Sequence, residues 1–328
     1  MGLRSHSPAA TFTARAGSTY ITRTSTSSTS AKATSLRKRS ARPALMAGPR
    51  GPDAGRSLRW RPIGKSVLNR HRPGSPHEGL SMTKGRYVEV NGLKTYYEVH
   101  GEGEPLLLMH GGFCTIETFA RQTPDFAAKY HVIVPERRGH GRTADVDGPI
   151  TYEAMAQDTI GLMKALGISN AHLLGYSDGG NTALIIALKR PDLVRKMVCI
   201  GANFHYNGMA AVAVQVMEHA SPENFYPWLI NKYKEVSPDG PEHLPIVFDK
   251  IIRMWREEPN LTTQDLARIQ ASTLVLVGDR DWVAIEHTVQ MFESIPNSHL
   301  CIVPGATHGA PFEKASLVNQ AVLDFLVT

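Results

Sequence analysis

The chain has 328 residues, and its 36 Lys and Arg against 30 Asp and Glu give a formal net charge of +6. Residues 1–80 carry 15 basic and 2 acidic side chains, whereas residues 81–328 carry 21 basic and 28 acidic ones. Because the part of the chain that can bury a core is acidic, the overall basic charge does not indicate a nucleic-acid-binding domain. No apolar run approaches the roughly 20 residues that a membrane-spanning helix needs.

Three cysteines, at positions 114, 199 and 301, are an odd number without C-x-x-C spacing. This pattern excludes a disulfide scaffold and gives no zinc signature. We therefore expect buried thiols in a reducing compartment.

Residues 1–81 show no pattern that would form a core. Residues 1–40 contain 17 Ser and Thr, 7 Lys and Arg and no acid, and their apolar residues follow neither helical nor strand periodicity. We predict a disordered basic tail rich in Ser, Thr and Arg. Its composition resembles that of an organelle transit peptide, which would place the protein in an organelle matrix. We favour an artefact of an upstream start, with Met82 as the first residue and a cytoplasmic location.

Residues 82–328 are predicted to form one α/β domain, because short apolar runs alternate with amphipathic segments. Residues 86–90 and 94–100 flank Asn91-Gly92, a dipeptide typical of a two-residue hairpin turn. Continuous apolar runs favour strands of a mostly parallel sheet covered on both faces; these runs are 105–110, 131–135, 171–175, 196–201, 273–278 and 299–303. Helices are expected at 152–166 and 181–189.

Residues 203–265 interrupt this alternation. They are rich in Met and aromatic residues at helical spacing, and they contain no strand candidate. We predict a helical cap inserted between two core strands, with a plain helical core layer as the alternative, because large adaptable side chains suit both.

The strongest chemical signal is the G-x-S-x-G motif at 175–179, which centres on Ser177. It follows a predicted strand and opens a predicted helix. A serine on this tight turn has its Oγ exposed at the carboxyl edge of the sheet. Ser177 is therefore the candidate nucleophile.

A serine hydroxyl needs a base to take its proton and a carboxylate to orient that base. His308 lies in a glycine-flanked loop after the last predicted strand, whereas His287 falls inside a helical pattern and His299 begins a strand. Asp281 and Asp279 both follow the strand 273–278. We prefer Asp281, which reaches farther across the edge, and we expect Asp279 to order the turn or to pair with the adjacent arginine. The order Ser177, Asp281, His308 is that of α/β-hydrolase triads.

The negative charge that develops on a substrate carbonyl needs fixed N–H donors. We expect them from Asp178, directly after the nucleophile, and from Gly112 in the His110-Gly111-Gly112-Phe113 segment, with Phe113 as the alternative. The His110 imidazole is interpreted as structural. The basic run 137–142 lacks the GK[ST] of a phosphate loop, so we expect it to order its own loop.

These motifs together resemble the α/β-hydrolase superfamily over residues 84–328: HGG at 110–112, RGHGRT at 138–143, GYSDGG at 175–180, LVGDRD at 276–281 and GATHG at 305–309. The RGHGRT motif is usually preceded by Asp, whereas here Glu136 and then Arg137 precede it. The segment 173–180, with 183–184, 196–198 and 201–203, is similar to the biphenyl-hydrolase-like and valacyclovir hydrolase group.

That resemblance implies a serine esterase acting on small acyl or aminoacyl esters, with Ser177, Asp281 and His308 as its triad. The alternatives are three. The substrate is a lactone, such as an acyl-homoserine lactone; the reaction is carbon–carbon bond cleavage of a vinylogous diketone; or the protein is a hydrolase-fold ligand receptor with little turnover. The expected partner is a small-molecule ester or lactone, with no nucleic acid, membrane, metal or organic cofactor. Substrate contacts are predicted at Phe113 and Asp178; the carboxylate of Asp178 would suit an ammonium group, or would simply stabilise a helix N-terminus.

Overall fold

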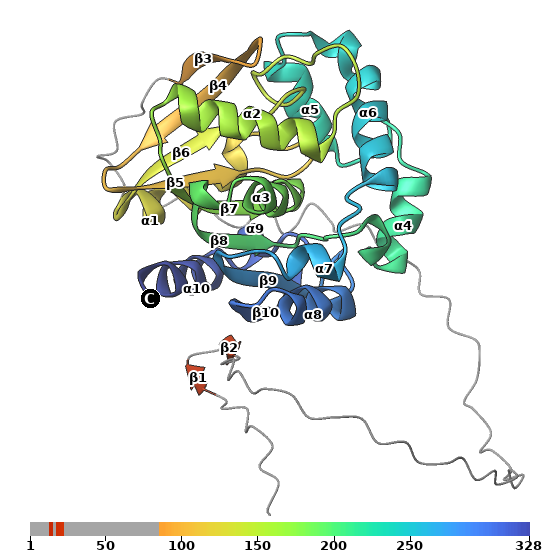
Figure 1. Cartoon of the computed structure of the whole chain (residues 1–328). Coiled ribbons are helices and arrows are strands. Elements are labelled where there is room, and N and C mark those ends of the chain that lie inside the picture. The colour runs from red at the N-terminus through yellow and green to blue at the C-terminus, as the bar shows by residue number, and fades with distance from the viewer. Residues whose placement is uncertain (1–12, 16–17, 23–84) are drawn as a thin grey trace, which may run out of the picture. The chain divides into compact units, whose positions relative to one another are not determined.

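The computed structural model describes residues 13–15, 18–22 and 85–328 (Figure 1). Most of the predicted tail, with the proposed start at Met82, lies outside the described residues. Two short strands within the tail, β1 (Thr13–Arg15) and β2 (Ser18–Thr22), were not expected from its composition. The β2 strand pairs antiparallel with β10.

One mixed sheet organises the described residues, in the strand order β1-β2-β10-β9-β8-β7-β5-β6-β4-β3. The pairs from β10 through β9, β8, β7 and β5 to β6 are parallel, and the β3–β4 hairpin joins β6 antiparallel. The strand bounds are β3 Arg86–Val90, β4 Leu93–His100, β5 Glu104–Met109, β6 Tyr130–Pro135, β7 Ala171–Tyr176, β8 Val194–Ile200, β9 Ser272–Arg280 and β10 Ser298–Thr307. All six apolar runs and the hairpin are confirmed as strands.

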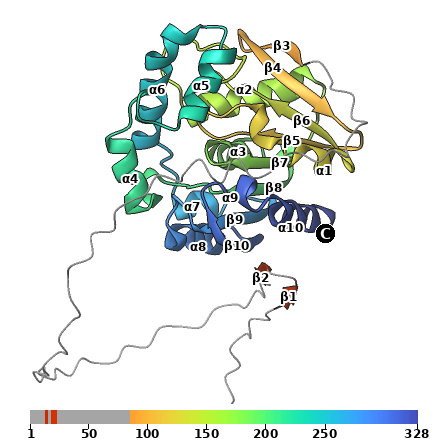
Figure 2. The ribbon, with the colours of Figure 1, turned by 180° about the vertical axis from the view of Figure 1, so that it is seen from behind.

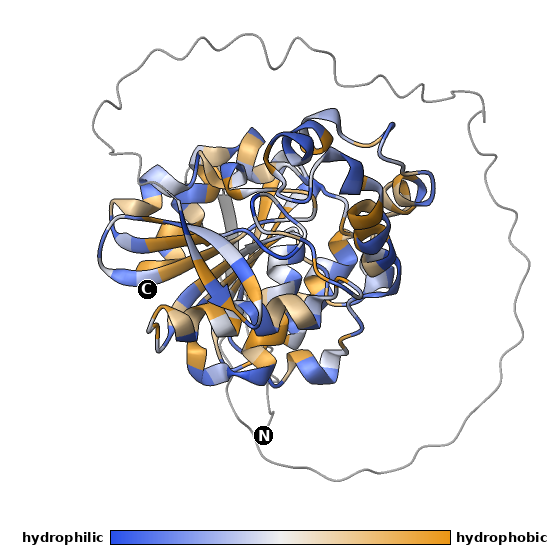
Figure 3. Cartoon of the chain, turned by 90° about the horizontal axis from the view of Figure 1, so that it is seen from above, coloured by the Kyte–Doolittle hydropathy of each residue, from blue (hydrophilic) through white to orange (hydrophobic). Residues whose placement is uncertain are grey.

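Helices cover both faces of the sheet because its central strands are apolar on both sides. In β5, Leu106 and Leu108 belong to one buried cluster, and Leu107 and Met109 belong to the other. The first cluster includes residues of α1 (Thr123–Ala127), α9 (Ala310–Glu313) and α10 (Ala315–Val327), and the second includes residues of α3 (Asp178–Lys189) and α8 (Ile285–Ser294). The α2 helix (Tyr152–Ala165) contributes to both. Apolar residues accordingly gather along the strands inside the domain (Figure 3).

The segment 203–265, here named the helical insertion, lies between β8 and β9. It contains α4 (Ala211–Glu218), α5 (Pro227–Val236) and α6 (Leu244–Glu257), which stand at one side of the sheet (Figures 1 and 2). This fully described segment has no strand, as predicted. The α7 helix (Thr263–Leu266), which begins at the end of this segment, instead packs against α3 and α8 of the main domain.

Short 3-10 helices complete the connections: η1 (Ile116–Phe119), η2 (Pro191–Leu193), η3 (Tyr206–Gly208) and η4 (Pro241–His243). Among the described residues, no helix combines the length and apolar character needed to cross a membrane. Cys114, Cys199 and Cys301 are all buried and unpaired, as expected.

Candidate active site

Ser177 occupies a sharp turn between β7 and α3. Its backbone has φ 54° and ψ −120°, a left-handed conformation that is costly for a residue with a Cβ. The turn is tight enough that a Cβ on Gly179 would lie 1.9 Å from the Met109 carbonyl oxygen, so only glycine fits there. The α3 helix begins at Asp178, three residues before the predicted start. The first turn was not predicted because Gly179 and Gly180 have low helix propensity and no apolar side chain.

His308 and Asp281 meet Ser177 at the carboxyl edge of the sheet. The His308 Nε2 lies 3.0 Å from the Ser177 Oγ, and the His308 Nδ1 lies 2.7 Å from the Asp281 Oδ1. Asp281 follows β9 and His308 follows β10, two strands that pair in parallel. Three residues predicted from separate loops are thus brought together.

The electrostatics of this chain of contacts favour an ionised Asp281. Burial alone would raise its pKa, but the facing His308 and the hydrogen bonds to Asp281 hold the pKa below its usual range. The backbone N–H groups of Gly278 and Val283 donate to the carboxylate at 3.3 and 3.1 Å. An ionised Asp281 accepts the Nδ1–H of His308, which leaves Nε2 free to accept the Ser177 hydroxyl proton.

Two aromatic rings that the sequence pattern did not single out flank His308. The Trp282 indole is stacked on the imidazole, with centroids 5.2 Å apart and planes 7° apart, and the Tyr176 ring lies at 5.3 Å. Their positions beside Asp281 and Ser177 in the sequence were the available signal.

The 110–113 loop follows β5 and lies beside the nucleophile. A Cβ on Gly111 would lie 3.1 Å from the Ser177 Cβ, which places this backbone next to the serine. The His110 Nδ1 contacts the Gly111 carbonyl at 2.8 Å, and its Nε2 accepts the Arg137 N–H at 3.2 Å. Burial holds the pKa of His110 well below its usual range, so the imidazole is neutral. It orders the loop and does not touch Ser177 Oγ.

Phe113 differs from the glycines before it. Its φ is 57°, and its side chain is only 3% exposed. The ring packs against Phe225, Phe248 and Trp255 of the helical insertion, with centroid distances of 5.1, 5.0 and 5.4 Å.

The Asp178 carboxylate is buried and already engaged. Tyr152 of α2 donates its hydroxyl to Oδ1 at 2.9 Å, and the Trp255 indole N–H lies 2.9 and 3.0 Å from Oδ1 and Oδ2. Burial raises the pKa of Asp178, against the opposing charge of the buried Arg137. This carboxylate therefore ties α2 and the helical insertion to the start of α3.

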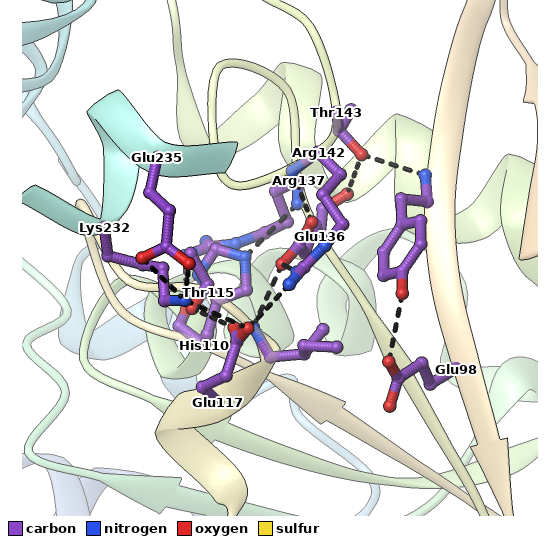
Figure 4. Close-up of polar contacts among 12 residues, drawn as sticks. Glu98, His110, Thr115, Glu117, Glu136, Arg137, Arg142, Thr143, Lys232 and Glu235 are labelled. Carbon is purple, nitrogen blue, oxygen red and sulfur yellow. Dashed lines mark hydrogen bonds and ion pairs between the residues drawn. The ribbon is translucent and has the colours of Figure 1, made fainter. Parts of the chain in front are cut away.

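Basic residues after β6 order their surroundings, as expected. Arg138 forms a two-point ion pair with Asp158, at 2.6 and 2.9 Å. Arg142 bridges the buried Glu136 and the more exposed Glu117, each at 2.6 Å, and Lys232 of α5 lies 3.6 Å from Glu117 (Figure 4). This chain of ion pairs joins the main domain to the helical insertion.

The remaining candidates lie away from Ser177 or act indirectly. The Asp279 Oδ1 accepts the Ala306 N–H at 3.2 Å and so holds the end of β10, directly before His308. His287 stacks on Phe204 at 4.0 Å, and His299 contacts Phe325. Within the described ranges, no group of three or more His, Cys, Asp or Glu side chains is placed to hold a metal ion.

Comparisons with known proteins agree with this architecture. A family model described as the alpha/beta hydrolase fold matches residues 104–235. The serine hydrolase BPHL of Homo sapiens is 31% identical over 261 residues, which cover 76% of this chain and 88% of the relative. A 2-hydroxy-6-oxo-6-phenylhexa-2,4-dienoate hydrolase of Burkholderia cepacia is 27% identical, covering 74% and 96%.

Two solved structures share the fold. A meta-cleavage product hydrolase from Pseudomonas fluorescens superposes with a TM-score of 0.66 at 23% identity, covering 74% of this chain and 97% of the other. Est816, described as an N-acyl homoserine lactone degrading enzyme, has a TM-score of 0.61 at 25% identity, covering 73% and 100%.

Proposed function

Because the chain belongs to the α/β-hydrolase family, we propose that it is a serine hydrolase that cleaves carboxylic esters through an acyl-enzyme intermediate. The observation that carries this proposal is the position of His308, with one ring nitrogen 3.0 Å from the Ser177 Oγ and the other 2.7 Å from Asp281. Nucleophile, base and orienting acid are the minimum set for this chemistry.

In the first step, His308 takes the proton of the Ser177 hydroxyl as Oγ attacks the ester carbonyl. Asp281 orients the imidazole and stabilises its charged form. His308 then gives the proton to the departing alcohol oxygen, which leaves an acyl group on Ser177. Water, deprotonated by the same histidine, attacks that acyl group and regenerates the serine.

The developing oxyanion is assigned to the backbone N–H groups of Gly112 and Asp178. Asp178 is the first residue of α3, so its N–H has no partner within that helix and points with the positive end of the helix dipole. Gly112 is supported by the close approach of the 110–113 loop to Ser177. Each such donor is worth about 10²–10³ in kcat.

Substrates are proposed to be small acyl or aminoacyl esters, with lactones as a further class. The aromatic cluster that encloses Phe113 is proposed to give the acyl side an apolar wall, and Asp178 a negative charge beside the nucleophile. The Asp178 Oδ2 lies beside Gly112, where an added Cβ would meet it at 2.6 Å. An α-ammonium group on the acyl side would complete its coordination.

The Ser177→Ala variant tests the reaction. Hydrolysis of p-nitrophenyl butyrate should fall by roughly 10⁴-fold or more, and labelling by a fluorophosphonate probe should disappear. Ser237→Ala, on the loop after α5, is the matched control and should keep both. Retention of most esterase activity by Ser177→Ala would refute the proposed function.

A substrate panel separates the alternatives that use the same three residues. Purified protein is assayed on acyl esters of increasing chain length, α-amino esters, acyl-homoserine lactones and a vinylogous diketone. Preferred turnover of the diketone would replace ester hydrolysis by carbon–carbon bond hydrolysis. Tight ligand binding with negligible turnover of every compound would indicate a receptor.

A further inference from the structure

The torsion at Phe113 is the least favourable feature of the 110–113 loop. A φ of 57° is ordinary for glycine but rare for a bulky side chain, and it persists only where the surroundings enforce it. The residue immediately follows Gly112, the assigned oxyanion donor. A change in this torsion would therefore change the direction of the chain at that donor.

What enforces the torsion is the helical insertion. Three aromatic rings surround Phe113, one before α5 and two on α6: Phe225, Phe248 and Trp255. Phe225 and Phe248 also contact each other, with centroids 5.7 Å apart. Phe113, Phe225 and Phe248 are each less than 5% exposed. The ring of Phe113 can remain in this cluster only if its backbone keeps the left-handed conformation.

The main domain holds the other end of the loop. The Arg137 guanidinium donates to the His110 carbonyl, and the His110 ring is hydrogen-bonded at both nitrogens. The loop is thus fixed by polar contacts at His110 and by aromatic packing at Phe113. The polar end lies in the main domain, and the aromatic end depends on the insertion.

We propose that Phe113 is a positioning residue through which the helical insertion sets the geometry of the oxyanion donors. The aromatic cluster holds the left-handed torsion, and the torsion aims the Gly112 backbone at the developing charge. This inference rests on the proposed serine hydrolase function. It adds that the insertion acts on the rate of the chemical step through backbone geometry, besides any contact with substrate.

A double-mutant cycle tests this coupling. Phe248→Ala removes one ring of the cluster; in the wild-type background kcat should fall about tenfold while KM changes less than about threefold, because misplaced donors weaken only the transition state. In the Phe113→Gly background the same change should alter kcat less than about twofold, since glycine adopts positive φ without support. The Phe113→Ala variant keeps the strained torsion but lacks the ring, so its kcat should be lower than that of Phe113→Gly.

Controls make each outcome decisive. Tyr233→Ala removes an equally buried ring of α5 that is not among the three contacting Phe113, and should lower stability without changing kcat of the folded protein. If Phe248→Ala proves insoluble, Phe248→Leu is compared in both backgrounds. An undiminished Phe248 effect in the Phe113→Gly background, or no effect in the wild type, overturns the inference. Failure of the wild type to hydrolyse any ester would instead contradict the proposed function.

Discussion

At the scale of single residues, Trp282 is the side chain whose importance follows most directly from geometry. Its ring lies nearly parallel to the imidazole of His308, so it restricts that ring to the orientation that reaches Ser177. A stacked indole would also stabilise the imidazolium of the proposed reaction.

Trp282→Leu should therefore lower kcat for p-nitrophenyl butyrate about tenfold, whereas Trp282→Phe should stay within about threefold of the wild type. Steady-state kinetics at fixed pH measure both values. Trp228→Leu is the control, because Trp228 is 54% exposed and its ring contacts Phe312. Equal losses for the leucine and phenylalanine variants would argue against a role for stacking.

Asp178→Asn separates the two roles considered for this carboxylate. Both Tyr152 and Trp255 contact Oδ1, so an asparagine oxygen at that place keeps one contact to each ring and removes the charge. The second Trp255 contact, to Oδ2, is lost because an amide nitrogen cannot accept the indole N–H. We expect the variant to lose about tenfold in kcat/KM on α-amino esters and to change little on acyl esters of the same size. Measuring kcat/KM on both ester classes distinguishes the two roles. Equal losses on both classes would mean that Asp178 acts only as a structural link between the helices.

At the scale of elements, the ion pair between Glu136 and Arg142 after β6 differs from a surface ion pair because its carboxylate is buried. Glu136 is fully buried, and burial raises its pKa to about 7. Arg142 is its cationic partner, at 2.6 Å. Loss of that partner would leave a buried carboxylate with only backbone donors.

Arg142→Met should lower the free energy of unfolding by about 2–4 kcal/mol, less than a fully enclosed pair because Arg142 is partly exposed. The loss should be greater at pH 8 than at pH 5, since Glu136 can bind a proton at the lower pH. Urea denaturation at both values measures it. The double variant Glu136→Gln with Arg142→Met should recover part of the loss, and a pH-independent loss would contradict the assignment to Glu136.

The elements themselves were largely predictable. The hairpin came from Asn91-Gly92, and the parallel strands came from apolar runs, because both signals are local. The proximity of Ser177, Asp281 and His308 followed from their positions after strands. The contact of Trp255 with Asp178 spans 77 residues and depends on the direction in which α6 faces, which the sequence pattern does not give. The left-handed Phe113 was also beyond prediction, since its cause is packing by a distant segment.

At the scale of the whole molecule, buried neutral histidines link stability to pH. Burial and the nearby Arg137 charge lower the pKa of His140 to about 3, while the unfolded chain has the ordinary value of 6.5. As pH falls from 6.5 toward 3, the unfolded chain binds a proton that folded His140 does not. Stability contributed by His140 is thus complete above pH 6.5 and is lost on acidification.

The measurable consequence is the slope of the free energy of unfolding against pH. His140→Asn keeps a donor for the Arg138 carbonyl and removes the titration, so between pH 6 and 4 the slope of unfolding free energy against pH should decrease by about 1.4 kcal/mol per unit. Comparing the variant with the wild type cancels the opposite contribution of Glu136. Parallel slopes would mean that His140 binds its proton in the folded protein.

The helical insertion separates Ser177 from Asp281 and His308 along the chain, which has a consequence for synthesis of the protein. Ser177 emerges from the ribosome long before His308, which follows it by 131 residues; Asp281 lies between them, 27 residues before His308. A nascent chain that has folded through β8 carries Ser177 without His308, its proposed proton acceptor. Ribosome-bound chains of increasing length should therefore cleave esters only after β10 has paired with β9. Ester hydrolysis would then report when the sheet is complete.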